Sequence, residues 1–340
     1  MKVLITGAAG FIGHHVARRL AETKRCEVLG VDHADGEGDP GLKRARLAEL
    51  AAFGDFRFLQ ADIADTEKFA GLVGHFRPDY VVHLGARTGV RDSFEKPAPY
   101  VHGNLVGFAS VLEACRRAPP RHLVYASSSS VYGAGALPPY REDDDTNQPV
   151  SFYGATKKCD EIMAHSYARN HGLNATGLRF FTVYGPWGRS NMAPTLFARA
   201  ICEGRPIPLF NEGRNRRDFT YIDDIVDGIV KILLYPLGVN LSNPPAVSPP
   251  NEPGLNLSKA RLFNLGHNRP VEMLLFVRML ESLLGRTAQV ELLPQQPGDM
   301  VETCADLSRV QAAFNYSPRV PLEDGLRRFV DWFKSYYQIK

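Results

Sequence analysis

The segment TGAAGFIG (residues 6–13) joins a short apolar run to a helical pattern, and it decides the fold class. Its glycines, Gly7, Gly10 and Gly13, are spaced GxxGxxG, a variant of the GxGxxG pattern of dinucleotide-binding folds. Such glycines allow a tight turn, a close approach of the backbone to a pyrophosphate, and close packing of helix on strand. Because glycines end strands in many folds, the surrounding sequence must decide what the segment means.

An acidic residue closes the second apolar run. Asp32 lies 19 residues beyond Gly13. A carboxylate at this position accepts hydrogen bonds from both hydroxyls of an adenosine ribose, and it would repel a 2′-phosphate. No arginine is adjacent to Asp32, so the sequence favours NAD over NADP.

Short apolar runs alternate with longer amphipathic segments in the first half of the chain. The runs predict strands, buried on both faces, at residues 2–6, 27–32, 56–60, 79–84, 122–127 and 174–181. Helical patterns lie between them, among others at 11–24, 99–117 and 153–172. Strands alternating with helices predict right-handed βαβ units and a parallel sheet.

The alternation stops after Gly185. Prolines and glycines predict a loop-rich region, with helices at 192–203, 222–234, 271–284 and 321–337 and a surface loop at 238–258. We therefore predict an α/β protein with a Rossmann-type doubly wound parallel sheet and a smaller α/β C-terminal substrate domain. The NAD-binding domain is expected to span 1–181, with 219–241 and 260–265 returning to it, and the smaller C-terminal domain 182–218 and 266–340.

Composition excludes several classes of protein. The chain has 340 residues, 44% apolar and 23% charged, as in ordinary globular proteins, and a net charge of +3 is too small to indicate nucleic-acid binding. Its five cysteines lie far apart, which predicts reduced thiols in a cytoplasmic protein and no zinc site. We expect no signal peptide and no membrane span, and the histidines show no spacing that predicts a metal site.

The segment YGATK places Tyr153 and Lys157 on one face of a helix. A lone YxxxK usually marks a solvated helix face, but the glycine loop changes its meaning. A lysine cation and an oxidised nicotinamide both favour tyrosinate, which can remove a proton from a substrate alcohol. Ser128, 25 residues before Tyr153, could share that proton.

Several motifs together resemble one family over essentially the whole chain. TGAAGFIG, Asp32, HLGA (83–86), SSSSVYG (127–133) and YGATK are similar to the extended short-chain dehydrogenase/reductase family. Within it, RFFTVYGPWGR (179–189), RRDFTYIDDIV (216–226) and PQQPGDMVETCADLSR (294–309) resemble the UDP-glucuronate 4-epimerases. The resemblance implies NAD as cofactor, bound by Gly7, Gly10, Phe11, Ile12, Gly13, Asp32, Asp62, Ile63, Leu84, Ala86, Asn104, Tyr153 and Lys157.

The four consecutive serines distinguish reaction types within this family. Members that dehydrate nucleotide sugars carry an Asp–Glu pair immediately before VYG, and members that decarboxylate carry a Glu there, whereas this chain has Ser129 and Ser130. Neutral hydroxyls supply no general acid or base for dehydration, and a carboxylate would repel a uronate. The serines therefore favour oxidation followed by re-reduction, which is epimerisation.

The resemblance also implies a mechanism and a substrate site. Tyr153 deprotonates the C4 hydroxyl, hydride passes to NAD, and it returns to the opposite face of the 4-keto sugar. Thr182 and Arg189 are expected to hold the uronate carboxylate, Arg217 the diphosphate and Asp299 the uridine ribose. The expected catalytic residues are Tyr153, Lys157 and Ser128. The expected substrate-binding residues are Ser128, Ser129, Ser130, Thr182, Arg189, Arg217, Asp299 and Arg91.

The leading hypothesis is conversion of UDP-glucuronate to UDP-galacturonate. Epimerisation of UDP-glucose or UDP-N-acetylglucosamine, decarboxylation of UDP-glucuronate, and an NAD-binding regulatory protein remain alternatives. Gln296 stands where relatives acting on UDP-glucose commonly have Arg. Surplus apolar residues in 99–117 and 153–172 predict a homodimer that pairs these helices.

Overall fold

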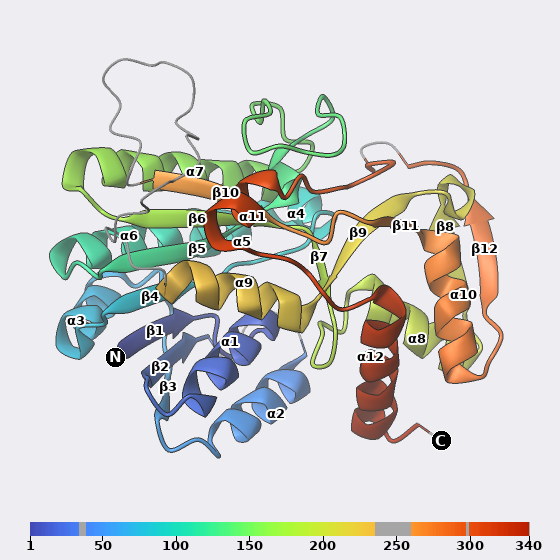
Figure 1. The fold of residues 1–340 in the computed structure, drawn as a ribbon, viewed down its shortest axis with the longest axis horizontal. Coiled ribbons are helices and arrows are strands. Elements are labelled where there is room, and N and C mark those ends of the chain that lie inside the picture. The colour runs from blue at the N-terminus through green and yellow to red at the C-terminus, as the bar shows by residue number, and fades with distance from the viewer. Residues whose placement is uncertain (34–38, 235–259, 297–298, 340) are drawn as a thin grey trace.

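A seven-stranded sheet organises the larger part of the chain in the computed structural model, which describes residues 1–33, 39–234, 260–296 and 299–339 (Figure 1). Its strand order is β10-β6-β5-β4-β1-β2-β3, and every pairing is parallel. The order reverses between β1 and β4, as in dinucleotide-binding folds. The predicted doubly wound sheet is confirmed. The strands are β1 Lys2–Thr6, β2 Glu27–Asp32, β3 Phe56–Gln60, β4 Tyr80–His83, β5 His122–Ser128, β6 Ala175–Phe180 and β10 Ala260–Leu265.

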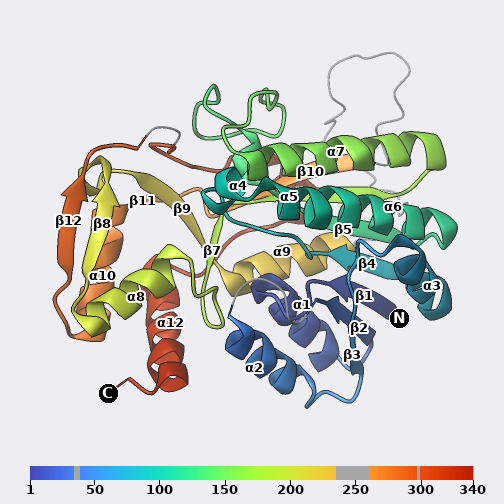
Figure 2. The ribbon, with the colours of Figure 1, turned by 180° about the vertical axis from the view of Figure 1, so that it is seen from behind.

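Helices cover both faces of this sheet (Figures 1 and 2). One layer consists of α3 (Thr66–Phe76), α6 (Gly107–Arg117) and α7 (Phe152–His171). The other consists of α1 (Phe11–Glu22) and α9 (Ile222–Leu234), with α2 (Pro40–Leu50) beside α1. The layers explain why the inner strands are apolar almost throughout, since both of their faces are covered. The prediction that residues 56–60 are buried on both faces is wrong, because β3 is the edge strand and Arg57, Leu59 and Gln60 are exposed. The predicted surface loop 238–258 and residues 235–241 of the predicted return lie outside the described residues.

The helix predicted at 99–117 is not continuous. After α4 (Asp92–Glu95) the chain forms α5 (Pro97–Tyr100), a π-helical segment at Val101–Val106, and then α6. Asn104 lies within the π-helical segment, and its side chain accepts from the Arg87 N–H at 2.8 Å and donates to Thr156 Oγ1 at 2.9 Å. These contacts tie the segment to α7 through Thr156 and to the chain after β4 through Arg87. Short π-helical insertions are frequent near functional sites.

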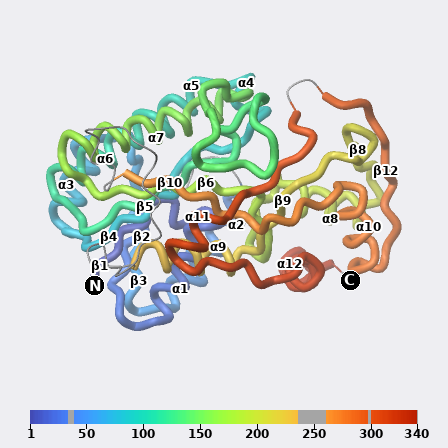
Figure 3. Tube along the Cα trace, turned by 45° about the horizontal axis from the view of Figure 1, so that its top comes forward, coloured from blue at the N-terminus to red at the C-terminus, as the bar shows by residue number. Residues whose placement is uncertain are grey.

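A smaller unit follows the large sheet (Figures 1 and 3). It has one sheet of order β11-β9-β7, in which β9 is parallel to β7 and antiparallel to β11, and a parallel pair β12-β8. The sequence analysis did not predict these strands, because they are short and Pro206, Pro208 and Pro270 obscure their patterns. The elements are β7 Thr182–Tyr184, α8 Ala193–Glu203, β8 Pro206–Phe210, β9 Arg216–Tyr221, β11 Pro270–Glu272, α10 Met273–Leu284, β12 Gln289–Leu293 and α12 Leu322–Tyr337. Between the last two, α11 (Ser308–Phe314) returns to the large sheet and packs on β10 and α9.

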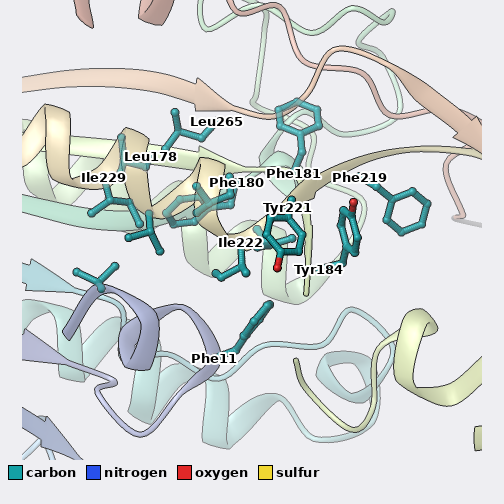
Figure 4. Packing of buried hydrophobic residues seen from close by; sticks show 14 of the residues in the cluster. Phe11, Leu178, Phe180, Phe181, Tyr184, Phe219, Tyr221, Ile222, Ile229 and Leu265 are labelled. Carbon is teal, nitrogen blue, oxygen red and sulfur yellow. The ribbon is translucent and has the colours of Figure 1, made fainter. Parts of the chain in front are cut away.

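The hydrophobic core continues from the large sheet into the smaller unit (Figure 4). Phe11 of α1 and Ile222 of α9 belong to the same buried cluster as Tyr184, Phe219 and Tyr221. The Tyr184 ring lies 6.1 Å from that of Phe219 and 5.7 Å from that of Tyr221, centroid to centroid. Because one core includes residues of both units, it fixes their relative position.

Candidate functional site

The glycine loop lies at the point where the strand order reverses. Gly7 has φ of 73°, and a Cβ there would lie 2.7 Å from the Leu84 carbonyl carbon and 2.7 Å from the Gly85 nitrogen. The backbone after β1 therefore packs directly against the backbone after β4, and only glycine fits. This edge of the sheet, beyond the carboxyl ends of its strands, is where ligands bind in open α/β folds.

A cavity of about 360 Å³, called here the glycine-loop cavity, opens beside this loop. Ile12, Gly13, Asn104, Tyr153 and Lys157 are not among its described lining residues. Arg189 is, together with Ser190 and Asn191. The predicted cofactor-binding residues that line it are Gly7, Gly10, Phe11, Asp32, Asp62, Ile63, Leu84 and Ala86.

Asp32 is held in place at the edge of the glycine-loop cavity. Its Oδ2 accepts a hydrogen bond from the Ala9 N–H at 3.0 Å, and its Oδ1 lies 3.2 Å from Lys43 Nζ. Sequence analysis missed Lys43 and Arg46, which also line this cavity, because LKRAR (42–46) has the pattern of a solvated helix face. An oriented carboxylate, a glycine cradle and a helix N-terminus together fit a dinucleotide.

A second cavity, of about 260 Å³, is called here the arginine cavity. It brings together four predicted substrate-binding residues that lie far apart in the sequence: Arg91, Thr182, Arg217 and Asp299. Sequence analysis did not single out Phe210 and Asn215, which also line it. The Arg91 guanidinium lies 5.0 Å from the centre of the Phe210 ring.

The charges of the arginine cavity favour an anionic ligand. Arg217 Nη2 donates to Asp299 Oδ1 at 3.0 Å, and Asn215 donates to Asp299 Oδ2 at 3.3 Å. Burial lowers the pKa of Arg217, and the Asp299 carboxylate opposes this shift. Two arginines against one carboxylate leave the lining with a positive charge that suits phosphate oxygens.

Two chain segments border both cavities. In the first segment, Leu84–Thr88 line the glycine-loop cavity and Arg91 lines the arginine cavity. In the second segment, Arg189–Asn191 line the glycine-loop cavity and Ala193 lines the arginine cavity. The two cavities are therefore neighbours. Arg189 and Thr182, predicted to bind the carboxylate together, line different cavities. The Arg189 guanidinium donates to Asn191 Oδ1 at 3.0 and 3.2 Å.

The serine run is a structured turn, not a solvated loop. Ser127 and Ser128 end β5 and are buried. Ser128 Oγ accepts from the Ser130 N–H at 3.1 Å and donates to Ser130 Oγ at 3.2 Å. A Cβ on Gly154 would collide with the Ser130 carbonyl, so the turn packs on the first residues of α7. Neither cavity includes Ser128, Ser129 or Ser130 in its described lining.

Tyr153 lies in the first turn of α7, beside the serine turn. Its N–H donates to Ser93 Oγ at 3.1 Å, and its ring lies 6.4 Å from that of Tyr100. Ser93 follows the segment 84–91 that borders both cavities, so Tyr153 is anchored next to their junction. One helical turn further on, Lys157 is buried and its Nζ lies 2.7 Å from Asp160 Oδ2.

Neither a metal cluster nor a membrane-spanning helix is found among the described residues. They contain no group of three or more His, Cys, Asp and Glu side chains arranged to hold a metal ion. Among the described helices, none combines the length and the apolar character needed to cross a lipid bilayer.

Comparison with known proteins gives consistent similarities. Residues 3–240 match the family described as NAD dependent epimerase/dehydratase. The chain is 41% identical to the probable UDP-glucuronate 4-epimerase of Rhizobium meliloti (strain 1021), over 99% of this chain and 98% of the relative. It is 43% identical to UDP-glucuronate 4-epimerase 4 of Arabidopsis thaliana, over 98% and 76%. The crystal structure of UDP-glucuronic acid 4-epimerase from Bacillus cereus, in complex with UDP-glucuronic acid and NAD, superposes with a TM-score of 0.86 at 35% identity, covering 99% of this chain and 100% of that one.

Proposed function

Because the chain belongs to the NAD dependent epimerase/dehydratase family, we propose that it inverts C4 of UDP-glucuronate to give UDP-galacturonate through a 4-keto sugar. The observation that carries this proposal is the pairing of two neighbouring cavities. One has the glycine cradle and Asp32 for a dinucleotide, and the other has a net positive lining for a sugar diphosphate. Its relatives named UDP-glucuronate 4-epimerase, similar over nearly the whole chain, support the uronate.

We assign the glycine-loop cavity to NAD. Gly7 and Gly10 would lie under the pyrophosphate at the N-terminus of α1, and Asp32 would accept from the adenosine ribose hydroxyls. Asp62 and Ile63 line the same cavity and are assigned to the cofactor as well. When bound, NAD supplies the oxidant that takes a hydride from C4 and later returns it. We assign Phe11, Ile12, Gly13, Leu84, Ala86, Asn104, Tyr153 and Lys157 to the same site.

Tyr153 moves the proton in the proposed reaction. Its phenolate takes the proton of the C4 hydroxyl during oxidation and returns a proton during reduction, so the net reaction consumes none. Lys157 stabilises the phenolate by its charge. Ser128, which ends β5 next to the start of α7, hydrogen-bonds the same hydroxyl.

The arginine cavity is the proposed binding site for the UDP group. Arg217 and Arg91 bind the diphosphate, and Asp299 accepts from the uridine ribose. Thr182 and the hydroxyls of Ser129 and Ser130 would contact the sugar. Because the segment 189–193 borders both cavities, we assign Arg189 to the uronate carboxylate, a role for which its guanidinium would have to leave Asn191.

We also retain the predicted organisation of the molecule. The strand and helix placements support the proposed division into an NAD-binding domain of 1–181 with returning segments and a substrate domain of 182–218 and 266–340. The five cysteines are all described and all free, which supports a reducing, cytoplasmic location.

A homodimer is the proposed assembly. Val101 and Val106 in the π-helical segment and Ile162 of α7 are exposed apolar residues on the two helical stretches predicted to pair. Burying them against a second copy would remove this apolar surface from water. Light scattering at micromolar concentration should give twice the chain mass, and Ile162→Glu should give the single mass. A wild-type monomer would contradict the dimer.

The function is tested by incubating the purified protein with UDP-glucuronate in D2O, without added cofactor. UDP-galacturonate without deuterium at C4 is the expected product, because the hydride leaves and returns within the site. A UDP-pentose as the main product would identify a decarboxylase. Conversion of UDP-glucose alone would identify a neutral-sugar epimerase, and NAD binding without turnover of any UDP-sugar would favour a regulatory protein.

A further inference from the structure

Lys157 forms a buried ion pair that sequence analysis did not predict. Its Nζ lies 2.7 Å from Asp160 Oδ2, and the two side chains are only 2% and 1% exposed. Tyr153, Lys157 and Asp160 are spaced by four and three residues, so they lie along one face of α7. Along this face the Asp160 carboxylate therefore follows the Tyr153 phenol and the Lys157 ammonium.

The contacts of Asp160 differ from those of the neighbouring carboxylate. Glu161 accepts from Arg179 at 2.8 and 2.9 Å and from Ser127 at 2.6 Å, which ties α7 to β6 and β5. Asp160 has no such connection: within the described parts of the chain, its Oδ1 is buried without a hydrogen-bond partner. The carboxylate of Asp160 is thus directed to Lys157 and holds no neighbouring strand.

Stability alone does not explain this pair. Removing two charges from water is costly, and a buried ion pair seldom stabilises a fold more than apolar side chains of the same size. Burial raises the pKa of Asp160 to about 6, while Lys157 opposes the shift. Above that pH the carboxylate is charged and balances the ammonium.

We infer that Asp160 is a positioning residue that acts through Lys157: it fixes the ammonium and offsets part of its charge, and so sets the pH at which Tyr153 becomes a base. The inference rests on the proposed roles of Tyr153 and Lys157. A charged Asp160 repels the Tyr153 phenolate, so the phenolate is less stable than it would be beside the Lys157 ammonium alone. Seven residues of helix separate Tyr153 from Asp160, a rise of about 10 Å. Two unit charges at that separation in a partly buried site shift a proton equilibrium by about one pH unit.

Other titratable groups around the pair do not replace this effect. Burial lowers the pKa of His83 to about 3, with Lys157 adding to the shift, and burial raises the pKa of Tyr125 far above its usual value. Both stay neutral between pH 5 and 9, and Glu161 is held in its ion pair with Arg179. The groups facing the pair are His83 of β4, Tyr125 of β5 and Glu161 of α7, with Arg179 of β6 behind Glu161.

The first test measures the pH dependence of kcat/KM for Asp160→Asn, which removes the charge and keeps the shape. The acid limb of the profile should move to lower pH by about one unit. Glu203→Gln is the matched control, because it removes an exposed carboxylate at the end of α8 and should leave the limb unmoved. An unmoved limb in Asp160→Asn, or a shift to higher pH, overturns the inference.

The second test needs no turnover. Phenolate absorbance of the NAD-loaded protein is followed against pH without substrate, and subtracting the Tyr153→Phe titration isolates Tyr153 from the other tyrosines. The ionisation midpoint should fall by about one unit in Asp160→Asn. If no UDP-sugar is converted, the proposed function fails, but this titration still decides the role of Asp160. Asp160→Ser replaces Asp160→Asn if the latter does not fold, and failure of both to fold overturns the inference in favour of a structural role.

Discussion

Arg46 and Trp187 are joined by a hydrogen bond of 2.7 Å across 141 residues of sequence, from the guanidinium Nη2 to the carbonyl oxygen. The same guanidinium donates through Nη1 to the Ala9 carbonyl at 2.9 Å. Trp187 has a φ of 61°, which is strained for a non-glycine residue, and its ring packs 5.6 Å from that of Trp332. Arg46 therefore holds the glycine loop and the segment leading to Arg189 together.

Arg46→Lys should weaken NAD binding roughly tenfold, because a lysine cannot reach both carbonyl groups and leaves a buried acceptor unpaired. Isothermal titration with NAD measures the change. Arg44→Lys is the control, since Arg44 is exposed on the same helix. Equal affinities in the two variants would mean that the contact between Arg46 and Trp187 has no part in cofactor binding.

Tyr153→Phe should lower kcat by roughly 10²–10⁴-fold, because it removes the proposed proton acceptor. The fold and NAD binding should persist, since the volume hardly changes. Steady-state assays with UDP-glucuronate and NAD titrations measure the two properties. Tyr167→Phe, on the same helix but outside both cavities, should keep full activity. Near-normal turnover in Tyr153→Phe would require another base.

Arg189→Ala should discriminate between substrates by their charge. If Arg189 pairs with the uronate carboxylate, kcat/KM for UDP-glucuronate should fall by roughly 30-fold or more, about 2 kcal/mol, and that for UDP-glucose much less. Some UDP-pentose is also expected, because a loosened β-keto acid can lose CO2. Arg205→Ala, at an exposed ion pair, is the control. Equal losses for both sugars would assign Arg189 to the diphosphate or to the fold.

His122 should make the protein less stable in mild acid. Burial lowers the pKa of His122 to about 4, below the 6.5 of the unfolded chain. The unfolded state therefore binds the proton first as the pH falls, so stability is present above pH 6.5 and is lost progressively toward pH 4. At pH 5 the loss from this residue is about 2 kcal/mol.

Urea unfolding at pH 7 and pH 5 measures this loss. His122→Asn should reduce the difference in unfolding free energy between the two pH values by about 2 kcal/mol. His75→Asn is the control, because His75 is exposed and lies elsewhere on the surface. An unchanged difference in His122→Asn would show that other groups cause the acid sensitivity.

The spacing of residues that are close in the sequence was enough to predict the sheet and the tyrosine–lysine pair. The interval from Gly7 to Gly13 and the position of Asp32 at the end of a strand predicted the dinucleotide-binding sheet, because each depends on a few neighbouring residues. The interval from Tyr153 to Lys157 likewise fixes both on one helix face. Continuous apolar strands predicted a sheet covered on both sides, since no other environment suits them.

Only the tertiary structure decided which residues far apart in the sequence come together. The arginine cavity unites Arg91, Thr182, Arg217 and Asp299, yet no local pattern in the sequence shows that these residues meet. Arg46 belongs to a helix whose charges look solvated until the fold places it against Trp187. The strands of the smaller unit form because partners far along the chain complete their hydrogen bonds, as in the pairing of β8 with β12. Sequence specifies local geometry through backbone periodicity, whereas contacts between distant segments depend on how all the elements pack at once.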